Sequence, residues 1–288
     1  MTRRHRANYP FWGVPFELAQ IRVHGYREQE KHVAKSVAIV TGASSGIGKA
    51  TALRLSHDFA ALVLVARSGE KLTEVSAEVG RNGAEALMLE VDLSGAAAAD
   101  TVIERALARF GRIDALLNIA GAVPGLDVFQ MTDEQWDAGL ALKFHGARRL
   151  TLRAWEALKL AKGAVIFTSG TAAEVPRAGA AAVGSINAAI EALAKAFADR
   201  GLEDGVQVNS VSPGAIMTGR RLSMIEKAAA AKKISVEDAK QQYLRQAGIV
   251  RFGEPEEIAG LMAFAVSPAA RWMTGAVLRM DGGEVKSV

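Results

Sequence analysis

SVAIVTGASSGIG, at residues 36–48, is the stretch that decides the fold. It opens with a short apolar run rich in β-branched residues, which predicts a buried strand. The glycines that follow allow a sharp turn and let the backbone approach a bound group without a Cβ in the way. A helix that begins at Gly46 offers its unpaired N–H groups and the positive end of its dipole to an anion. We interpret the segment as a phosphate-binding loop; the alternative is a tight strand–helix turn without a ligand.

Outward from this loop, strand-length apolar runs alternate with amphipathic segments. Strands are expected at residues 36–41, 61–66, 86–91, 115–119, 164–169, 206–211 and 277–280. Helices are expected at residues 46–57, 69–81, 96–110, 136–160 and 183–200. Such alternation is typical of βαβ units, which place parallel strands in one sheet with helices on both faces. No repeat or low-complexity linker divides the body of the chain, so the sequence predicts one α/β domain with a doubly wound parallel sheet over residues 33–288.

Composition limits the classes to which the chain can belong. Half of its 288 residues are apolar, which is enough for a sizeable core. Cysteine is absent, which excludes disulfides, thiolate catalysis and Cys-ligated metals and fits a cytoplasmic protein. The longest apolar run, residues 59–66, has the length of a strand and falls well short of the roughly 18 residues of a membrane span. We expect a cytoplasmic protein without a membrane segment or a metal site.

The basic charge is concentrated in residues 1–32, which hold six Lys/Arg and three Glu and so carry three of the four net positive charges. The remainder has no basic stripe, so we expect no nucleic-acid binding. The segment lacks the features of a secretory signal and of a mitochondrial presequence. It is a disordered arm, an arm packed on a partner subunit, or an artefact of start-site choice. We favour the artefact, because Val33 is compatible with a GTG start codon and residues 29–30 with a translated ribosome-binding sequence.

Further motifs make the resemblance of the chain to a known family specific. The loop reads TGASSGIG at residues 41–48, and it is followed by DL at 92–93, NIAG at 118–121 and NSVSPG at 209–214. RFGEPEEIA at 251–259, TG at 274–275 and DGG at 281–283 complete the series. Over nearly all of residues 33–284 the chain resembles the short-chain dehydrogenase/reductase family. The resemblance implies a single Rossmann-type domain that binds a nicotinamide dinucleotide.

The resemblance also implies a set of cofactor-binding residues. They are Gly42, Ser44, Ser45, Gly46, Ile47, Gly48, Arg67, Ser68, Asp92, Leu93, Asn118, Ala120, Gly121, Asn187, Pro213, Gly214, Ile216 and Thr218. Ala66 stands where an NAD-specific site has an acidic residue for the ribose hydroxyls, and Arg67 follows it. A guanidinium pairs with a 2′-phosphate, which a carboxylate would repel. We predict NADP(H) rather than NAD(H), although the loop lacks the second basic residue that some NADP-preferring relatives carry.

The proton-transfer residues of the family are missing. The family has a Tyr four residues before a Lys on one helix, a Ser thirteen residues before that Tyr, and an Asn on the preceding helix. The matching positions hold Val183, Asn187, Gly170 and Lys143. Val183 cannot transfer a proton, Gly170 has no side chain, and Asn187 lacks the charge that lowers a neighbouring pKa. We therefore predict an atypical member without the usual Asn-Ser-Tyr-Lys set.

Several polar residues are candidate substitutes, and they are Ser169, Thr168, Thr171, Ser185, Glu174, Lys143 and His145. Ser169 could contact a ligand at the end of its strand, and Asn187 can bond a ribose hydroxyl. Lys143 could act as a general acid or an anion clamp, or pair with a carboxylate elsewhere. His145 has a pKa suited to acid–base work but could equally pack on a neighbour. The catalytic residues stay open, with Ser169, Lys143 and Asn187 as candidates.

Two further patterns bear on the substrate and on assembly. Residues 218–248 form a substrate lid in this family, and here an apolar stripe of Leu222, Met224 and Ile225 lies beside Arg220 and Arg221. The stripe suits an apolar substrate with an anionic group, and it equally suits a solvated amphipathic lid helix. The helix at 183–200 has alanines at 188, 192 and 196 on one row, which fits the helix-paired dimers and tetramers of the family; ordinary helix propensity is the alternative.

Two functions follow from this combination. The first is an NADP(H)-binding oxidoreductase with a non-standard active site, which transfers a hydride to or from a small carbonyl, alcohol or enoyl substrate. Hydride transfer needs only proximity and orientation from the protein, so the missing residues do not forbid it. The second is a catalytically silent homologue that acts as a cofactor sensor, or as a structural subunit in a hetero-oligomer with an active homologue.

Overall fold

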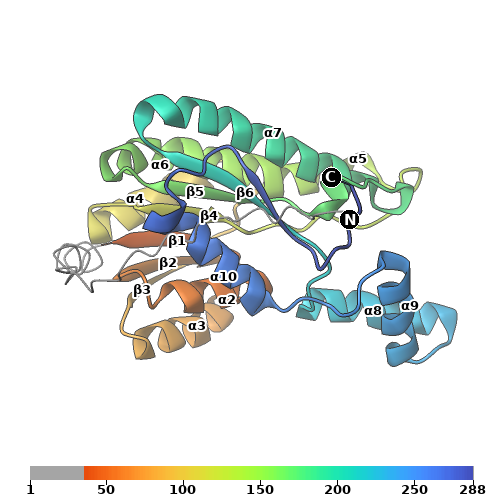
Figure 1. Ribbon diagram of the computed structural model, residues 1–288. Helices are drawn as coiled ribbons and strands as arrows, with labels where there is room; N and C mark the ends of the chain where they lie inside the picture. Colours follow the sequence, from red (N-terminus) through yellow and green to blue (C-terminus); the bar gives the residue numbers. More distant parts are fainter. Residues whose placement is uncertain (1–35, 288) are drawn as a thin grey trace, which may run out of the picture.

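The computed structural model describes residues 36–287, and its centre is one parallel sheet (Figure 1). The strands are β1 (Val37–Thr41), β2 (Ala61–Ala66), β3 (Glu85–Glu90), β4 (Ala115–Asn118), β5 (Ala164–Thr168), β6 (Gln207–Pro213) and β7 (Val277–Met280). They lie in the order β3-β2-β1-β4-β5-β6-β7, and every neighbouring pair is parallel. The strand order reverses between β1 and β4, and ligands bind such sheets at the carboxyl ends of the strands beside that reversal. The predicted doubly wound α/β fold is confirmed, while the predicted extension at 1–32 lies outside the described residues.

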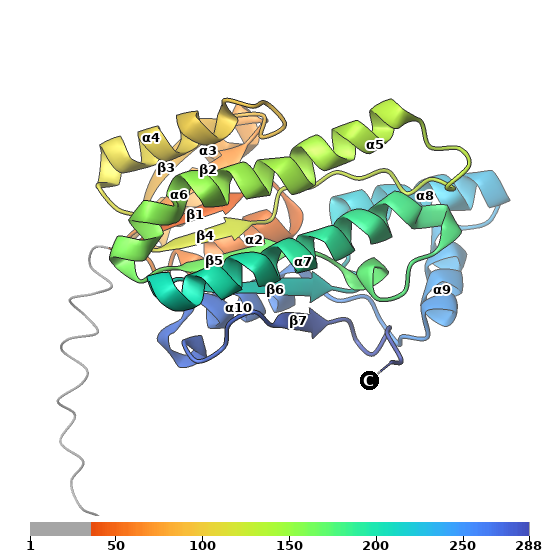
Figure 2. The same ribbon diagram turned by 90° about the horizontal axis from the view of Figure 1, so that it is seen from above.

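Helices cover both faces of the sheet (Figures 1 and 2). One layer consists of α4 (Ala98–Phe110), α6 (Ala147–Ala161) and α7 (Ala181–Asp204), and the other of α2 (Gly46–Leu55), α3 (Gly69–Arg81) and α10 (Pro255–Val266). Each layer forms its own hydrophobic core with one face of the sheet. Strands β1 and β2 are buried along their whole length, because a parallel sheet between two helix layers has no solvated face. Helix α10 is not among the helices that the sequence pattern predicts.

Helix α7 is long and apolar enough to cross a membrane by length and composition, over Ala178–Asp204. The sequence of this helix contains no long continuous apolar run, because Asn187, Glu191 and Lys195 interrupt it. The helix buries Ile186 and Ile190 on the side that faces the sheet. It is therefore a covering helix of the sheet, and Figure 2 shows it lying along β5 and β6. The predicted row of alanines at 188, 192 and 196 lies on its exposed side.

Beyond the carboxyl edge of the sheet, helices α8 (Gly219–Lys232) and α9 (Val236–Ala247) form a separate lobe, which we call the lid (Figures 1 and 2). Each begins at a side-chain cap: Thr218 Oγ1 accepts from the N–H of Arg221 at 3.2 Å, and Ser235 Oγ accepts from the N–H of Asp238 at 3.0 Å. The two helices enclose a small apolar cluster of Ile225, Ala229, Ala239, Ile249 and Phe252. Since the lid has a core of its own, it can vary without disturbing the sheet.

The helix predicted at 136–160 differs from the structure in its middle. Helix α5 (Asp133–Gly139) passes into a π-helical segment, η1 (Leu140–Gly146), which continues into α6. A π-helical turn holds one more residue than an α-helical turn and is frequent at functional sites. Hydrophobic periodicity does not reveal it, because the apolar pattern on either side remains helical. Lys143 lies at the centre of this segment.

Candidate active site

A cavity of about 570 Å³ opens at the carboxyl ends of the central strands, between helix α7 and the lid. Its walls come from the segments after β4, β5 and β6, the start of α7, both lid helices and residues near the C-terminus. The four positions at which the resemblance places the family's catalytic residues all line it, and they are Lys143, Gly170, Val183 and Asn187. The cavity therefore brings together the sequence positions at which a proton-transfer site is expected.

Lys143 and Asn187 contact each other directly across this cavity. Lys143 Nζ donates to Asn187 Oδ1, and it also donates to the backbone carbonyl of Ser169 at 3.2 Å. The family would have Asn at the first position and Lys at the second, so the two residue types have exchanged places. The cation is retained in the site, but it comes from the π-helical segment η1 instead of α7.

Burial, with a smaller contribution from the charge of Arg220, lowers the pKa of Lys143 from 10.5 to about 8, while Glu191 opposes the shift. Desolvation favours the neutral form of an amine, and a neighbouring cation acts in the same direction. An amine with a pKa near 8 is predominantly protonated at neutral pH and still gives up its proton readily. This is the property that a general acid requires.

Glu191 is a member of the site that the sequence pattern did not reveal. It follows Asn187 by one helical turn, and its side chain lies near those of Ser169 and Lys143. Burial raises the pKa of Glu191, and its Oε1 is buried without a hydrogen-bond partner among the described residues. The spacing of four residues from Asn187, which places the two on one helix face, is the signal that could have identified it.

Gly170 and Val183 stand at the two positions where the resemblance places the family's Ser and Tyr, and neither carries a hydroxyl group. Gly170 has φ +154° and ψ 156°, a conformation that side chains rarely adopt, and a Cβ there would lie 3.0 Å from Asn187 Nδ2. Val183 packs its side chain against the cluster of Val123, Ala182 and Ile186. The backbone at Gly170 therefore suits glycine, the position at which the resemblance predicts that the family's serine is missing.

The structure separates the candidate substitutes into two groups. Ser169, Thr168 and Thr171 line the cavity. Ser169 Oγ lies 3.4 Å from both the carbonyl of Val211 and Ser210 Oγ, and Thr168 Oγ1 is buried without a partner within residues 36–287. The others do not line the cavity, and they are Glu174, Ser185 and His145.

His145 packs edge-on against the ring of Phe144, with the ring centroids 5.3 Å apart. Burial lowers its pKa, and the charges of Arg148 and Arg149 lower it further. Of the two interpretations of His145, the structure thus favours packing on a neighbour. Its neutral imidazole takes no part in the cavity.

The glycine loop between β1 and α2 is shaped by close backbone contacts. Gly42 has φ +68°, and a Cβ there would lie 3.2 Å from the backbone of Ala120. A Cβ on Gly48 would overlap the carbonyl oxygen of Gly42. Ser45 is the N-cap of α2 but makes no side-chain capping bond, so the first N–H groups of that helix remain available. This geometry fits the pyrophosphate of a dinucleotide.

Other predicted cofactor residues lie at the carboxyl ends of neighbouring strands. Arg67 and Ser68 follow β2, and the side chain of Arg67 is exposed and makes no hydrogen bond or ion pair within residues 36–287. Hydrogen bonds from Ser94 lower the pKa of Asp92, and the charge of Arg67 contributes to the same shift. Arg67 therefore lies near Asp92 with its guanidinium free to meet a phosphate.

The remaining predicted residues surround the same crevice. Asn118 donates to Thr151 Oγ1 at 3.2 Å, while its own Oδ1 is buried without a partner in the described chain. Leu93 is buried, and a Cβ on Gly46 would lie 3.2 Å from Thr218 Cγ2, so the glycine loop meets the start of the lid. The residues of this set that line the cavity are Ile47, Gly121, Asn187, Pro213, Gly214, Ile216 and Thr218.

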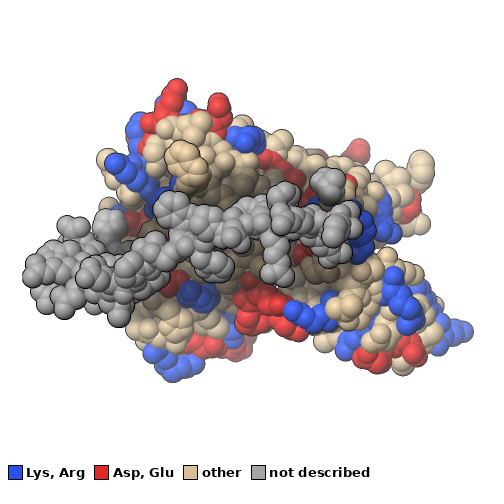
Figure 3. Space-filling model, in the orientation of Figure 1, with Lys and Arg blue, Asp and Glu red and all other residues tan. Residues whose placement is uncertain are grey.

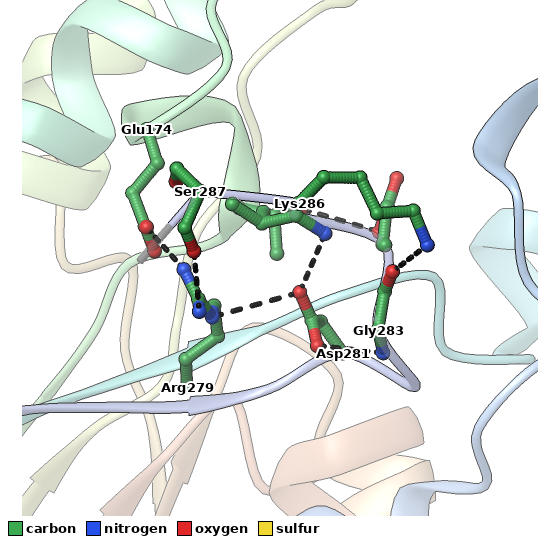
Figure 4. Close-up of polar contacts among 9 residues, drawn as sticks. Glu174, Arg279, Asp281, Gly283, Lys286 and Ser287 are labelled. Carbon is green, nitrogen blue, oxygen red and sulfur yellow. Dashed lines mark hydrogen bonds and ion pairs between the residues drawn. The ribbon is translucent and has the colours of Figure 1, made fainter.

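The segment after β7, residues 281–287, forms one wall of the cavity, and we call it the C-terminal strap. Figure 4 shows how it is held: Arg279 forms an ion pair with Glu174, lies 3.7 Å from Asp281 and donates to the carbonyl of Ser287 at 3.4 Å. Asp281 in turn accepts from the N–H of Val285 at 2.8 Å. Glu284 and Val285 line the cavity. The strap is thereby fixed to the segment after β5, which carries Gly170.

Comparison with known proteins identifies the family. The family model described as enoyl-(acyl carrier protein) reductase matches residues 42–284, which includes both the glycine loop and the cavity.

The chain belongs to the short-chain dehydrogenase/reductase family.

Among relatives of this short-chain dehydrogenase/reductase, a 3-oxoacyl-[acyl-carrier-protein] reductase of Synechocystis is 34% identical over 252 residues, which cover 86% of this chain and 96% of the relative. The short-chain reductase protein NovJ of Streptomyces niveus is 28% identical over 249 residues, with 86% and 94% covered.

Solved structures agree with this assignment. The L-sorbose reductase of Gluconobacter frateurii, in complex with NADPH and L-sorbose, superposes with a TM-score of 0.85 at 28% identity and covers 89% of this chain and 98% of its own. YwfH, an NADPH-dependent reductase involved in bacilysin biosynthesis, gives a TM-score of 0.82 at 28% identity, with 88% and 100% covered. The chain is thus an oxidoreductase with an NADP-binding Rossmann fold.

Proposed function

We propose that this short-chain dehydrogenase/reductase is an active NADP(H)-dependent enzyme that interconverts a small carbonyl compound and its alcohol, with Lys143 as the proton donor and acceptor. An enoyl substrate is the other reaction class open to the same machinery. The direct hydrogen bond between Lys143 and Asn187 carries the proposal, because it keeps a cation at the centre of a cavity from which the usual tyrosine is missing.

The residues present fit the cofactor. The glycine loop and the open N-terminus of α2 would hold the pyrophosphate, and Arg67 would pair with the 2′-phosphate that distinguishes NADP from NAD. Residues 213–218 would border the nicotinamide, and Asn187 would bond a ribose hydroxyl. When bound, the reduced cofactor supplies the hydride that adds to the carbonyl carbon. The preference for NADP(H) over NAD(H) rests on Arg67 and on the absence of a carboxylate at Ala66.

Lys143 has one donor to spare for the substrate. An ammonium group carries three N–H donors. Two of them are directed to Asn187 Oδ1 and the carbonyl of Ser169, which fixes the orientation of the amine. The third is free to donate to the oxygen of a carbonyl in the cavity and, with the pKa lowered to about 8, to transfer its proton. Asn187 and Ser169 are positioning residues in this scheme, and Glu191 stabilises the charged amine.

The test is a comparison of Lys143→Met with Lys227→Met, which removes an exposed lysine from lid helix α8. NADPH and NADH binding is measured by calorimetry, and turnover is measured with a panel of ketones, aldehydes and enoyl compounds. We expect wild-type turnover with NADPH, a fall of about 10²- to 10⁴-fold in Lys143→Met, and no change in Lys227→Met. Full activity in a folded Lys143→Met enzyme would remove the lysine from the mechanism.

The alternative of a catalytically silent subunit predicts NADPH binding without turnover on any substrate. It is not favoured, because the relatives found by both comparisons are named as reductases and the cavity retains a polarised, oriented amine. The calorimetric and turnover measurements above separate the two functions without further experiment.

We also propose that the enzyme is a homo-dimer or homo-tetramer in the cytoplasm. Helices α6 and α7 expose apolar groups side by side on their outer face: Leu152 and Leu160 on α6 are 52% and 87% exposed, and the alanine row of α7 is exposed beside them. Monomeric proteins rarely leave such a face uncovered. Light scattering on the purified protein gives the assembly state; a monomer at micromolar concentration would contradict this proposal. Cell fractionation tests the location.

A further inference from the structure

Four cationic side chains line the cavity, and none has a carboxylate partner. They are Lys143, Arg177, Arg220 and Arg221. The ion pairs within residues 36–287 all involve other residues. The one carboxylate in the cavity wall, Glu284, accepts a hydrogen bond from Thr171 Oγ1 at 3.3 Å. An excess of cations on a partly enclosed wall favours an anionic ligand.

Two of the four cations are already engaged by the protein. Lys143 is held by Asn187 and Ser169, as described above. Arg220 donates to the carbonyls of Gly121 at 3.3 Å and Val123 at 2.5 Å, and it thereby fastens the start of the lid to the segment after β4. Arg220 thus links the lid to the segment after β4 by hydrogen bonds. The side chains of Arg177 and Arg221 make no hydrogen bond to a backbone carbonyl within residues 36–287.

Arg221 contacts the hydroxyl of Tyr243, and both residues line the cavity together with Arg177 and Glu284. Burial raises the pKa of the Tyr243 phenol, while the charges of Arg221 and Arg177 lower it and that of Glu284 raises it. Arg221 donates to Tyr243 Oη at 3.1 Å and stacks over its ring at 5.0 Å. The side chain of Arg177 is exposed and makes no hydrogen bond or ion pair in the described part of the chain.

The tyrosine is held rigidly and presents an unused donor. Its ring stacks on Phe252, with centroids 5.4 Å apart, and it is half-buried in the lid. Because its oxygen accepts from Arg221, its own hydrogen remains free for a ligand. Two guanidinium groups and one hydroxyl hydrogen therefore face the same end of the cavity. Arginines in this arrangement bind carboxylates and phosphates in two-bond geometry.

Charge decides between these two anions. Arg177 and Arg221 contribute two positive charges and Glu284 contributes one negative charge, so these three side chains sum to plus one; Arg220, whose guanidinium is directed to backbone carbonyls, lines the cavity as well. A carboxylate monoanion balances the charge of these three side chains, whereas Glu284 repels a phosphate dianion more strongly. The cavity wall also includes the apolar side chains of Val123, Val175, Val183 and Met224. The occupant thus has an apolar body and one carboxylate.

We propose that Arg177, Arg221 and Tyr243 form a carboxylate-binding subsite, so that the substrate is an apolar oxo acid or the corresponding hydroxy acid. The assignment rests on the proposed function, because it places the carbonyl group of the substrate at Lys143 and the carboxylate at Arg177, Arg221 and Tyr243. It resolves the two interpretations of the lid stripe: Met224 contacts the ligand space, Ile225 is buried in the lid core, and the arginine beside them is directed to the cavity. Figure 3 shows Lys and Arg side chains over the lid, so exposed arginines outside the cavity serve as controls.

The experiment compares Arg221→Met and Arg177→Met with Arg245→Met, which removes an exposed arginine from lid helix α9 outside the cavity. Calorimetry with octanoate, octanamide and octyl phosphate, in the presence of NADP⁺, measures binding without turnover. We expect octanoate to bind most tightly and to lose about 10- to 100-fold in affinity in Arg221→Met, and less in Arg177→Met because that side chain is exposed. Octanamide binding and the Arg245→Met variant should be unaffected.

Turnover separates this proposal from the one on which it rests. Reduction of apolar oxo acids and of their methyl esters with NADPH is measured for the same variants. We expect Arg221→Met to raise the KM for the acids and to leave the KM for the esters unchanged. Equal binding of octanoate and octanamide, tighter binding of octyl phosphate, or equal effects of Arg221→Met and Arg245→Met would overturn the subsite. Arginine-dependent octanoate binding without reduction of any compound would sustain the subsite and count against the reductase. Because Arg177 is exposed, Arg177→Met provides a variant that folds.

Discussion

The glycine loop and the Lys143–Asn187 pair lie at the same edge of one sheet but are specified in different ways. The shape of the loop depends on close contacts at its glycines, where a Cβ on Gly48 would overlap the carbonyl of Gly42 and a Cβ on Gly42 would lie 3.2 Å from the backbone of Ala120. The pair is determined by two side chains that are 44 positions apart in the chain. The loop therefore leaves no room for a side chain at Gly48, whereas the pair can be rebuilt by exchanging its members. A family can thus keep its cofactor site recognisable while its catalytic site is rearranged.

The largest effect is expected from Gly48→Ala. The added methyl group cannot fit beside the carbonyl of Gly42, so the loop must shift, at a cost of about 3 kcal/mol in the free energy of unfolding. Since the same backbone would hold the pyrophosphate, NADPH affinity should fall by about 100-fold. Calorimetry and urea unfolding measure both effects. Gly260→Ala on α10, where a Cβ meets nothing within 4 Å, is the control and should be neutral or stabilising. Unchanged NADPH binding in Gly48→Ala would contradict the view that the backbone shape of the glycine loop is required for cofactor binding.

A smaller effect is expected from Arg67→Ala, which removes a side chain of the predicted cofactor-binding site. Loss of a charge-assisted pair with the 2′-phosphate should weaken NADPH binding by about 2 kcal/mol, or about 30-fold, and leave NADH binding unchanged. The ratio of the two dissociation constants is the readout, because a general disturbance of the site would affect both cofactors equally. Equal losses for NADPH and NADH would show that Arg67 does not determine the preference.

The buried amine of Lys143 should make stability depend on pH. The folded pKa is about 8 and the unfolded pKa 10.5, so below pH 8 the folded state bears the full cost of burying a charge. Between pH 8 and 10.5 the folded protein has released a proton that the unfolded chain retains, and stability rises with pH. The stability advantage of Lys143→Met over wild type should therefore be about 3 kcal/mol larger at pH 7 than at pH 10.5. Urea unfolding at both values tests this, and a pH-independent difference would contradict it.

The smallest effect is expected from Gly170→Ser, which restores a residue type that the family uses. At φ +154° a side chain is strained, and its Cβ would lie 3.0 Å from Asn187 Nδ2, so we expect a loss of about 1 kcal/mol in stability and no gain in turnover. Gly170→Ala separates the strain from the effect of the hydroxyl group, since both variants share the Cβ. An increase in turnover specific to Ser would show that the rearranged site can still use the original chemistry.

The same contrast explains what the sequence could predict. The strands and most of the helices follow from local patterns, because apolar runs and glycine turns are encoded within a few residues. The cofactor-binding residues are those that the family resemblance implies, and they stay a prediction. The substitutions at Lys143 and Asn187 are visible in the sequence, but their hydrogen bond is not, since it depends on how two helices pack. Arg177 and Tyr243 escape sequence reasoning for the same reason: each reaches the cavity from a different element, and only tertiary contact joins them. Glu191, one helical turn after Asn187 on α7, could have been identified from its spacing.

The π-helical segment η1 has a consequence for how the active site tolerates changes of length. Because its turn contains one residue more than an α-helical turn, deletion of a single residue between 140 and 142 would let the segment relax to an ordinary α-helix. Such a deletion would preserve the helix and the fold but change the direction in which Lys143 leaves the helix, and so its contact with Asn187. Insertions and deletions in this segment therefore reposition the amine that we propose as the proton donor, an effect that no single substitution reproduces.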